Sequence, residues 1–119
     1  MKGQAVLREK SFAFSLRIIE LCRFLKESKK EYVVYRQMLR SGTAIAALVR
    51  EAEFAQSKAD FINKLSIALK EANETEYWIE LLCCSQSLHC NTHDATIQLL
   101  TEIIKMLVAS IKTAKGNKE

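Results

Sequence analysis

The chain has 119 residues, of which 49% are apolar and 27% charged, with a formal net charge of +4. This length predicts a single domain, residues 1–119, and the composition excludes a disordered chain, while no run approaches the roughly 18 consecutive apolar residues of a membrane span. Proline is absent and only three glycines occur, so a chain rich in Leu, Ala, Glu and Lys predicts an all-α fold.

The compartment is predicted from the N-terminal segment. "MKGQAVLREK" lacks the apolar core of a signal peptide, so the expected location is cytoplasmic. Cysteines in that compartment are expected to be reduced thiols rather than a disulfide framework. Four are present: Cys22, Cys83, Cys84 and Cys90.

Capping residues divide the chain into four predicted helices. Ser11 is a candidate N-cap, Ser28 and Ser57 each precede an acidic residue by three positions as in a capping box, and Asn91 precedes the last apolar segment. The predicted helices cover residues 11–27, 29–55, 58–88 and 92–114. Short connections between long helices favour an antiparallel, up-down-up-down four-helix bundle.

The first predicted helix carries two apolar stripes. One contains Phe14, Ile18, Leu21 and Leu25 and is expected to face the core. The other contains Phe12, Leu16 and Ile19. A helix of an isolated bundle buries one stripe, so the second predicts a contact with another subunit.

The second predicted helix combines small and basic residues. Gly42 and Ala46 stand at i and i+4, a spacing that lets another helix approach closely. Arg36, Arg40 and Arg50 recur on its predicted outer face.

The third predicted helix contains "DFINKLSIALKEANETEYWIELL" and is apolar on two sides. Its core stripe is Phe61, Leu65, Ala68, Ala72, Ile79 and Leu82. Glu76 projects into that apolar arc, where a carboxylate requires a partner or a raised pKa.

The opposite side of this helix predicts a subunit interface. Ile67, Trp78 and Leu81 lie there, and Trp78 is the candidate anchor because large aromatic residues dominate interface energetics. Glu71 and Glu74 stand beside them and could pair with a basic residue of a neighbouring subunit. The alternative is that the helices splay and Trp78 covers the rim of the subunit's own core.

The fourth predicted helix, "TIQLLTEIIKMLVASI", has a broad apolar arc, with Leu99 and Met106 outside it. The surplus of apolar surface on three helices predicts a homo-oligomer.

Two groups of residues have side chains of metal-binding types. Four acids resemble those of carboxylate-bridged bundles, but no Glu-x-x-His motif accompanies them: Glu51, Glu53, Glu76 and Glu80. A second group has zinc-binding residue types at spacings of no common zinc motif: Cys83, Cys84, His89, Cys90 and His93. We therefore predict no metal, no cofactor and no catalytic residue, and hence no enzyme.

Two long segments resemble a known bacterial family. "EKSFAFSLRIIELCRFL" and "LRSGTAIAALVREAEFAQSKADFINKLSIALKEANETEYWIELL" are similar to four-helix-bundle proteins encoded in intervening sequences of 23S ribosomal RNA genes. The chain departs from the common Ser-Ile-Gly-Ala-Asn pattern of that family at residues 44–48. The resemblance implies a ring-like homopentamer. It also implies kinship with accessory variability proteins of diversity-generating retroelements, which are basic pentamers that associate with nucleic acid and a reverse transcriptase.

The charge is unevenly distributed along the chain. Residues 1–50 carry 11 basic and 4 acidic side chains, a net charge of +7, whereas residues 51–119 carry a net charge of −3. In an oligomer a basic patch would be repeated and would meet a phosphate backbone as a multivalent surface. The candidate nucleic-acid contacts are Arg23, Lys26, Lys29, Lys30, Arg36, Arg40 and Arg50.

Three functional hypotheses follow. The leading one is a non-enzymatic, pentameric module that binds RNA or DNA through repeated basic patches, by shape and phosphate contacts. The alternative is a protein-protein interaction scaffold that does not bind nucleic acid. A small metal-dependent enzyme is the third.

Overall fold

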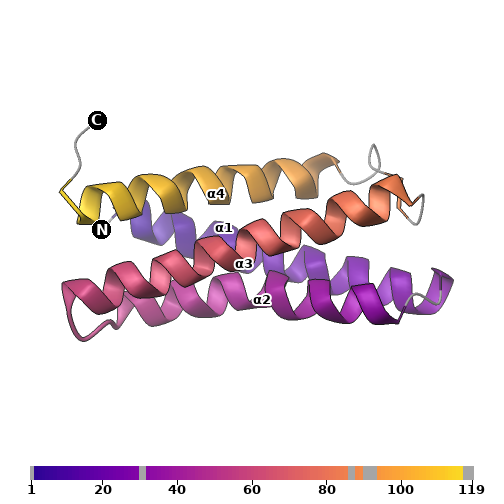
Figure 1. Cartoon of the computed structure of the whole chain (residues 1–119), viewed down its shortest axis with the longest axis horizontal. Coiled ribbons are helices and arrows are strands. Elements are labelled where there is room, and N and C mark those ends of the chain that lie inside the picture. The colour runs from indigo at the N-terminus through magenta and orange to yellow at the C-terminus, as the bar shows by residue number, and fades with distance from the viewer. Residues whose placement is uncertain (1, 30–31, 86–87, 90–93, 117–119) are drawn as a thin grey trace.

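The computed structural model describes residues 2–29, 32–85, 88–89 and 94–116. Within these residues the regular structure is helical and contains no strand. Its elements are α1 (Lys2–Phe24), the π-helical turn η1 (Leu25–Lys29), α2 (Val33–Glu53), α3 (Lys58–Cys84) and α4 (Asp94–Ala114). Figure 1 shows each α-helix running opposite to the one before it, as the predicted up-down-up-down bundle requires.

The helices pack around an elongated core in a molecule of 45 × 26 × 19 Å. α1 packs on α2 and α4, and α3 packs on α2 and α4, so α1 and α3 are diagonal in the bundle. The predicted core stripes of α1 and α3 are buried, apart from Phe61, which is half-buried at the edge. None of the described helices combines the length and apolar character needed to cross a membrane.

The first helix begins nine residues earlier than predicted. Ser11 is not an N-cap, because it is fully buried inside α1 and its hydroxyl donates to Arg8 O at 3.1 Å. Residues 2–10 contain good helix formers, and Leu7 extends the buried stripe toward the N-terminus. The apolar spacing that continues to Leu7 therefore indicates the start of α1 better than Ser11 does.

The start of the second helix is also corrected. α2 begins at Val33, with Tyr32 at the N-cap position and no side-chain capping bond, whereas Ser28 lies in η1. The prediction for Asn91 lies outside the described residues. The prediction for Ser57 is confirmed, since its hydroxyl accepts from Asp60 N at 3.0 Å.

α3 ends at Cys84 instead of residue 88, with Ser85 at the C-cap position. α4 ends at residue 114, as predicted. Two residues later Gly116 has a φ of 83°, a left-handed conformation that glycine adopts without strain and that commonly terminates a helix.

Gly42 allows α1 and α2 to approach closely, as predicted. A Cβ atom at this position would lie 2.9 Å from Ile18 Cγ2 and 3.0 Å from Ile18 Cγ1. Ile18 is fully buried and β-branched, so it has little freedom to move aside. The contact between Gly42 and Ile18 therefore sets the short distance between α1 and α2 at this point.

Candidate nucleic-acid and subunit interfaces

Three of the seven predicted nucleic-acid contacts gather at one end of the bundle. Arg23 is in the last turn of α1, Lys26 is in η1 and Arg36 is in the first turn of α2. The two helices meet at this end (Figure 1). All three side chains are exposed, and none has an ion-pair or hydrogen-bond partner in the described part of the chain. We call them the basic end; their charges are available to an external anion.

The prediction for Lys29 and Lys30 is only partly covered by the structure. The backbone of Lys29 completes η1, next to the basic end. The Lys29 side chain and the whole of Lys30 lie outside what the structure describes.

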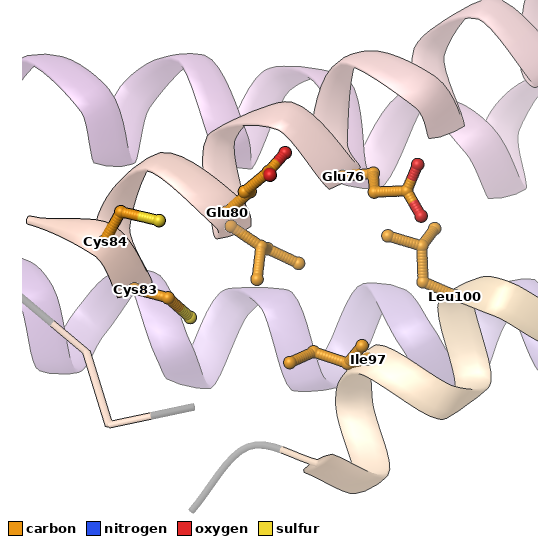
Figure 2. Close-up of a pocket in the computed structure, with 7 residues that line it drawn as sticks. Glu76, Glu80, Cys83, Cys84, Ile97 and Leu100 are labelled. Carbon is orange, nitrogen blue, oxygen red and sulfur yellow. The ribbon is translucent and has the colours of Figure 1, made fainter. Parts of the chain in front are cut away.

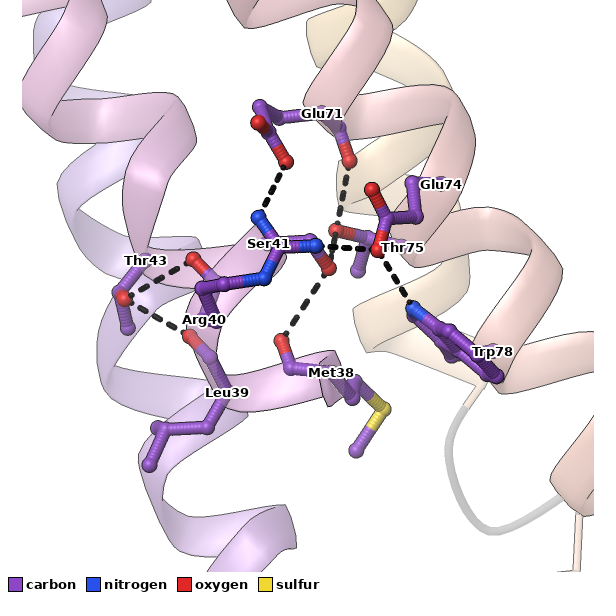
Figure 3. Close-up of polar contacts among 9 residues, drawn as sticks. All are labelled: Met38, Leu39, Arg40, Ser41, Thr43, Glu71, Glu74, Thr75 and Trp78. Carbon is purple, nitrogen blue, oxygen red and sulfur yellow. Dashed lines mark hydrogen bonds and ion pairs between the residues drawn. The ribbon is translucent and has the colours of Figure 1, made fainter. Parts of the chain in front are cut away.

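Arg40 has different surroundings, because two carboxylates of the same chain bind its guanidinium (Figure 3). Nη1 donates to Glu71 Oε1 at 3.1 Å and Nη2 donates to Glu74 Oε2. The indole nitrogen of Trp78 donates to the same Glu74 oxygen at 3.0 Å. The charge of Arg40 is therefore already compensated within the subunit.

These contacts shift the ionisation of both partners. The hydrogen bond from Trp78, followed by that from Arg40, lowers the pKa of the Glu74 carboxyl below its ordinary value. The hydrogen bond to Glu74 raises the pKa of Arg40. Glu71 and Glu74, which the sequence suggested as partners for a neighbouring subunit, thus have a cation within their own chain.

A buried hydroxyl pair sets the register of α2 and α3 beneath this network. Ser41 Oγ and Thr75 Oγ1 lie 2.7 Å apart, and both residues are fully buried. Thr75 Oγ1 also has Glu71 O as an acceptor at 2.8 Å and Ser41 Oγ has Met38 O at 3.4 Å, so either hydroxyl could be the donor between the two. This pair was not predicted, although each helix has a small polar residue at a core-facing position of its sequence pattern.

Arg50 does not belong to the basic end. It is exposed near the C-terminus of α2, 14 residues after Arg36, which places it about 21 Å along the helix. The predicted basic surface is therefore divided into a free cluster at one end, a compensated arginine in the middle and a separate arginine at the other end.

Two exposed aromatic residues accompany the basic end. Phe24 is the last residue of α1 and Tyr32 immediately precedes α2, and their exposed fractions are 42% and 46%. Tyr32 makes an edge contact with the buried ring of Tyr35 at a centroid distance of 6.5 Å. Neither residue was among the predicted site residues, although both lie within a few positions of the turn predicted between the first two helices.

The second apolar stripe of α1 is open to solvent within the subunit. Phe12 and Leu16 are 51% and 52% exposed, and Ile19 is 38% exposed. Large apolar side chains that recur along one face of a helix form a patch of the kind that binds another protein surface.

The outer side of α3 is more mixed than predicted. Ile67 is half-buried and Leu81 is 38% exposed. Trp78 packs partly against the core, and its indole N–H donates a hydrogen bond to Glu74. Trp78 therefore covers the edge of the subunit core in the isolated chain. The more exposed aromatic residue is Tyr77, at 54%, which meets Trp78 edge-on at a centroid distance of 4.9 Å.

The acids considered for a metal do not form one site. Glu51 pairs with Lys64 at 3.5 Å, and Glu53 pairs with Arg8. Glu76, predicted to project into the apolar arc, is exposed, as is Glu80. Among the residues described, no group of three or more His, Cys, Asp or Glu side chains could hold a metal ion.

The cysteines differ from one another. Cys83, expected to be a reduced thiol, is disulfide-bonded, whereas Cys22 and Cys84 are free. Burial raises the pKa of the Cys22 thiol to about 12, so it is poorly nucleophilic. Cys84 and His89 are exposed; Cys90 and His93 lie outside the described residues.

Comparisons with known proteins agree with this architecture. The profile of the family described as 23S rRNA-intervening sequence protein matches residues 4–109. A crystal structure of a protein of unknown function from the S23 ribosomal protein family of Bacteroides thetaiotaomicron VPI-5482 is 51% identical. It superimposes with a TM-score of 0.90 over 92% of this chain and 98% of that one. No curated protein matches the chain.

Proposed function

We propose that this chain, which belongs to the 23S rRNA-intervening sequence protein family, is a non-enzymatic cytoplasmic module that forms a homopentameric ring and binds RNA or DNA. The observation that carries the proposal is the basic end, where Arg23, Lys26 and Arg36 are exposed and have no ion-pair or hydrogen-bond partner among the residues that the structure describes. A ring multiplies this small cluster, which is weak in a single subunit, into a surface that contacts many phosphates.

The positions of the apolar surfaces support assembly into a ring. The open stripe of α1 and the outer side of α3 belong to diagonal helices, so they face away from each other. A contact between two different faces is head-to-tail, and repeating it closes into a ring when the rotation between subunits permits. The proposed interface therefore joins Phe12 and Leu16 of one subunit to the Trp78 and Leu81 region of the next.

The charges favour nucleic acid as the ligand. Unpaired guanidinium and ammonium groups bind phosphate without reading sequence, and the exposed rings of Phe24 and Tyr32 supply surfaces on which unpaired bases can stack. This combination favours single-stranded segments over a regular duplex.

The alternative is a protein-binding scaffold, and one observation favours it. Phe54, at the turn between α2 and α3, is 80% exposed, far from the basic end. A large aromatic side chain so exposed is a suitable anchor for a partner protein.

Light scattering coupled to size exclusion, with absorbance recorded at protein and nucleic-acid wavelengths, tests the proposal. At low salt we expect a pentamer that carries nucleic acid, and at high salt the same pentamer without it, because phosphate contacts weaken steeply with salt. A pentamer that is free of nucleic acid at both salt concentrations, and that does not bind added single-stranded RNA, would favour the scaffold. A monomer would contradict the ring.

A further inference from the structure

A cavity between α3 and α4 takes no part in the proposed interfaces. Its volume is about 410 Å³, within the range of small-molecule sites. The residues that line it are Glu76, Ile79, Glu80, Cys83, Cys84, Ile97 and Leu100. Figure 2 shows the glutamates and cysteines coming from α3, and Ile97 and Leu100 coming from α4 across the opening.

The inner wall of this cavity is apolar. Ile79 and Leu100 are buried members of the core, and Ile97 packs partly against it. None of the described residues that line the cavity is aromatic. Short aliphatic chains therefore fit the wall by apolar burial, whereas the described lining offers no aromatic ring to a quaternary ammonium group.

The rim of the cavity, as far as the structure describes it, is acidic. Glu76 and Glu80 are exposed, and neither has a hydrogen-bond or ion-pair partner in the described part of the chain. They stand four residues apart on α3, where two like charges repel each other. A cation at the rim would relieve this repulsion and would be attracted by both carboxylates.

We propose that this cavity binds a small amphipathic primary amine. The aliphatic chain lies on Ile79, Ile97 and Leu100, and the ammonium group lies at Glu76 and Glu80. An ammonium group has three donors and can bind both carboxylates at once. A neutral alcohol of the same length gains only the apolar contact, and a carboxylate of that length is repelled.

Cys84 allows binding to be measured directly. Its thiol is free, exposed and part of the cavity lining, whereas Cys22 is buried with its pKa raised to about 12. The rate of Cys84 alkylation by iodoacetamide is followed by peptide mass spectrometry, with n-hexylammonium chloride as the probe. Hexanol, sodium hexanoate and sodium chloride at matched ionic strength are the comparison additives.

We expect hexylammonium to slow alkylation of Cys84 with an apparent Kd on the order of 1 mM, as suits a ligand of few atoms. Hexanol should protect much less and hexanoate not at all. In the Glu76→Gln/Glu80→Gln variant the apparent Kd should rise roughly tenfold, from the loss of two partly screened charge contacts. The matched control Glu9→Gln/Glu20→Gln removes two exposed charges from α1 and should leave the Kd unchanged.

Circular dichroism verifies that both variants fold, and isothermal titration calorimetry gives a second measure of binding. Equal protection by hexanol and hexylammonium would overturn the proposal, and so would an unchanged Kd in Glu76→Gln/Glu80→Gln. Absence of both protection and calorimetric heat would overturn it as well. None of the described residues that line the cavity belongs to the basic end or to the open α1 stripe, so protection of Cys84 by the amine can be measured whether or not the protein binds nucleic acid.

Discussion

Arg36 and Arg40 lie one helical turn apart on α2, yet their surroundings are opposite. Arg36 has no partner in the described part of the chain, whereas Arg40 is bound by Glu71 and Glu74 from α3. Sequence position assigned both to one basic face. The difference teaches that the number of basic residues on a helix does not give the charge available to a ligand, because the neighbouring helix decides which charges are already compensated.

The largest expected effect comes from disrupting the proposed ring, because each particle then carries one basic end, with its uncompensated Arg36, instead of five. Leu16→Glu places a charge on the open stripe of α1 and should give monomers that bind single-stranded RNA about 100-fold more weakly. Light scattering and fluorescence anisotropy measure the two effects.

The control for this variant is Gln98→Glu, which adds the same charge at an exposed position of α4. It should leave both size and affinity unchanged. A Leu16→Glu protein of unaltered size would show that the α1 stripe is not the subunit contact.

The next largest effect is expected from neutralising the basic end. Arg23→Gln/Lys26→Gln/Arg36→Gln should lower RNA affinity at low salt by at least about tenfold, and should flatten the dependence of affinity on salt, because fewer counterions are released. Anisotropy titrations over a series of salt concentrations provide both values.

The matched variant Lys58→Gln/Lys105→Gln/Lys112→Gln removes three exposed charges from α3 and α4. It should lower affinity far less. If both triple variants lose affinity equally, only net charge matters and the basic end has no special role.

Releasing Arg40 should make it behave like Arg36. In Glu71→Gln/Glu74→Gln the guanidinium loses both carboxylates, so RNA affinity should increase about threefold. The free energy of unfolding should fall by less than about 1 kcal/mol, because the ion pairs are partly exposed. Urea denaturation and anisotropy measure these quantities, and an equal increase in affinity for Glu9→Gln/Glu20→Gln would argue against a specific role for Arg40.

The smallest effect is expected in how the stability of the fold around Arg40 depends on pH. The pKa of Glu74 is lower in the folded protein than in the unfolded chain. The ionised carboxylate therefore stabilises the fold fully at pH values above the pKa of the unfolded chain. This stabilisation is lost as the pH falls through the pKa of the folded protein. Trp78, the single tryptophan, donates to Glu74, so its fluorescence should change over the same acidic range.

The Glu74→Gln variant should be less stable than the parent at neutral pH by under about 1 kcal/mol, and this difference should shrink at acidic pH. A fluorescence transition retained in that variant would assign it to another group.

Sequence patterns predicted the parts of this protein that depend on local periodicity. The buried stripes of α1 and α3, the Ser57 cap and the close approach at Gly42 follow from residue spacing and backbone sterics. Capping serines were less reliable: Ser11 and Ser28 have the right residue type, but Ser11 is in the interior of α1 and Ser28 is in η1. A side chain that can cap also forms hydrogen bonds within a helix, so its identity alone does not locate a helix end.

The sequence by itself determined that the chain is all-helical with apolar stripes that face the core, because the spacing of apolar residues along one helix is a local property. It also determined the resemblance to the 23S rRNA-intervening sequence proteins, because that resemblance depends only on the order of the residues. Only the tertiary structure decided that Arg40 is compensated, that Ser41 and Thr75 meet in the core, and that Glu76 and Glu80 border a cavity. Each of these depends on which residues of a second helix stand opposite, and that register is set by packing between segments distant in sequence.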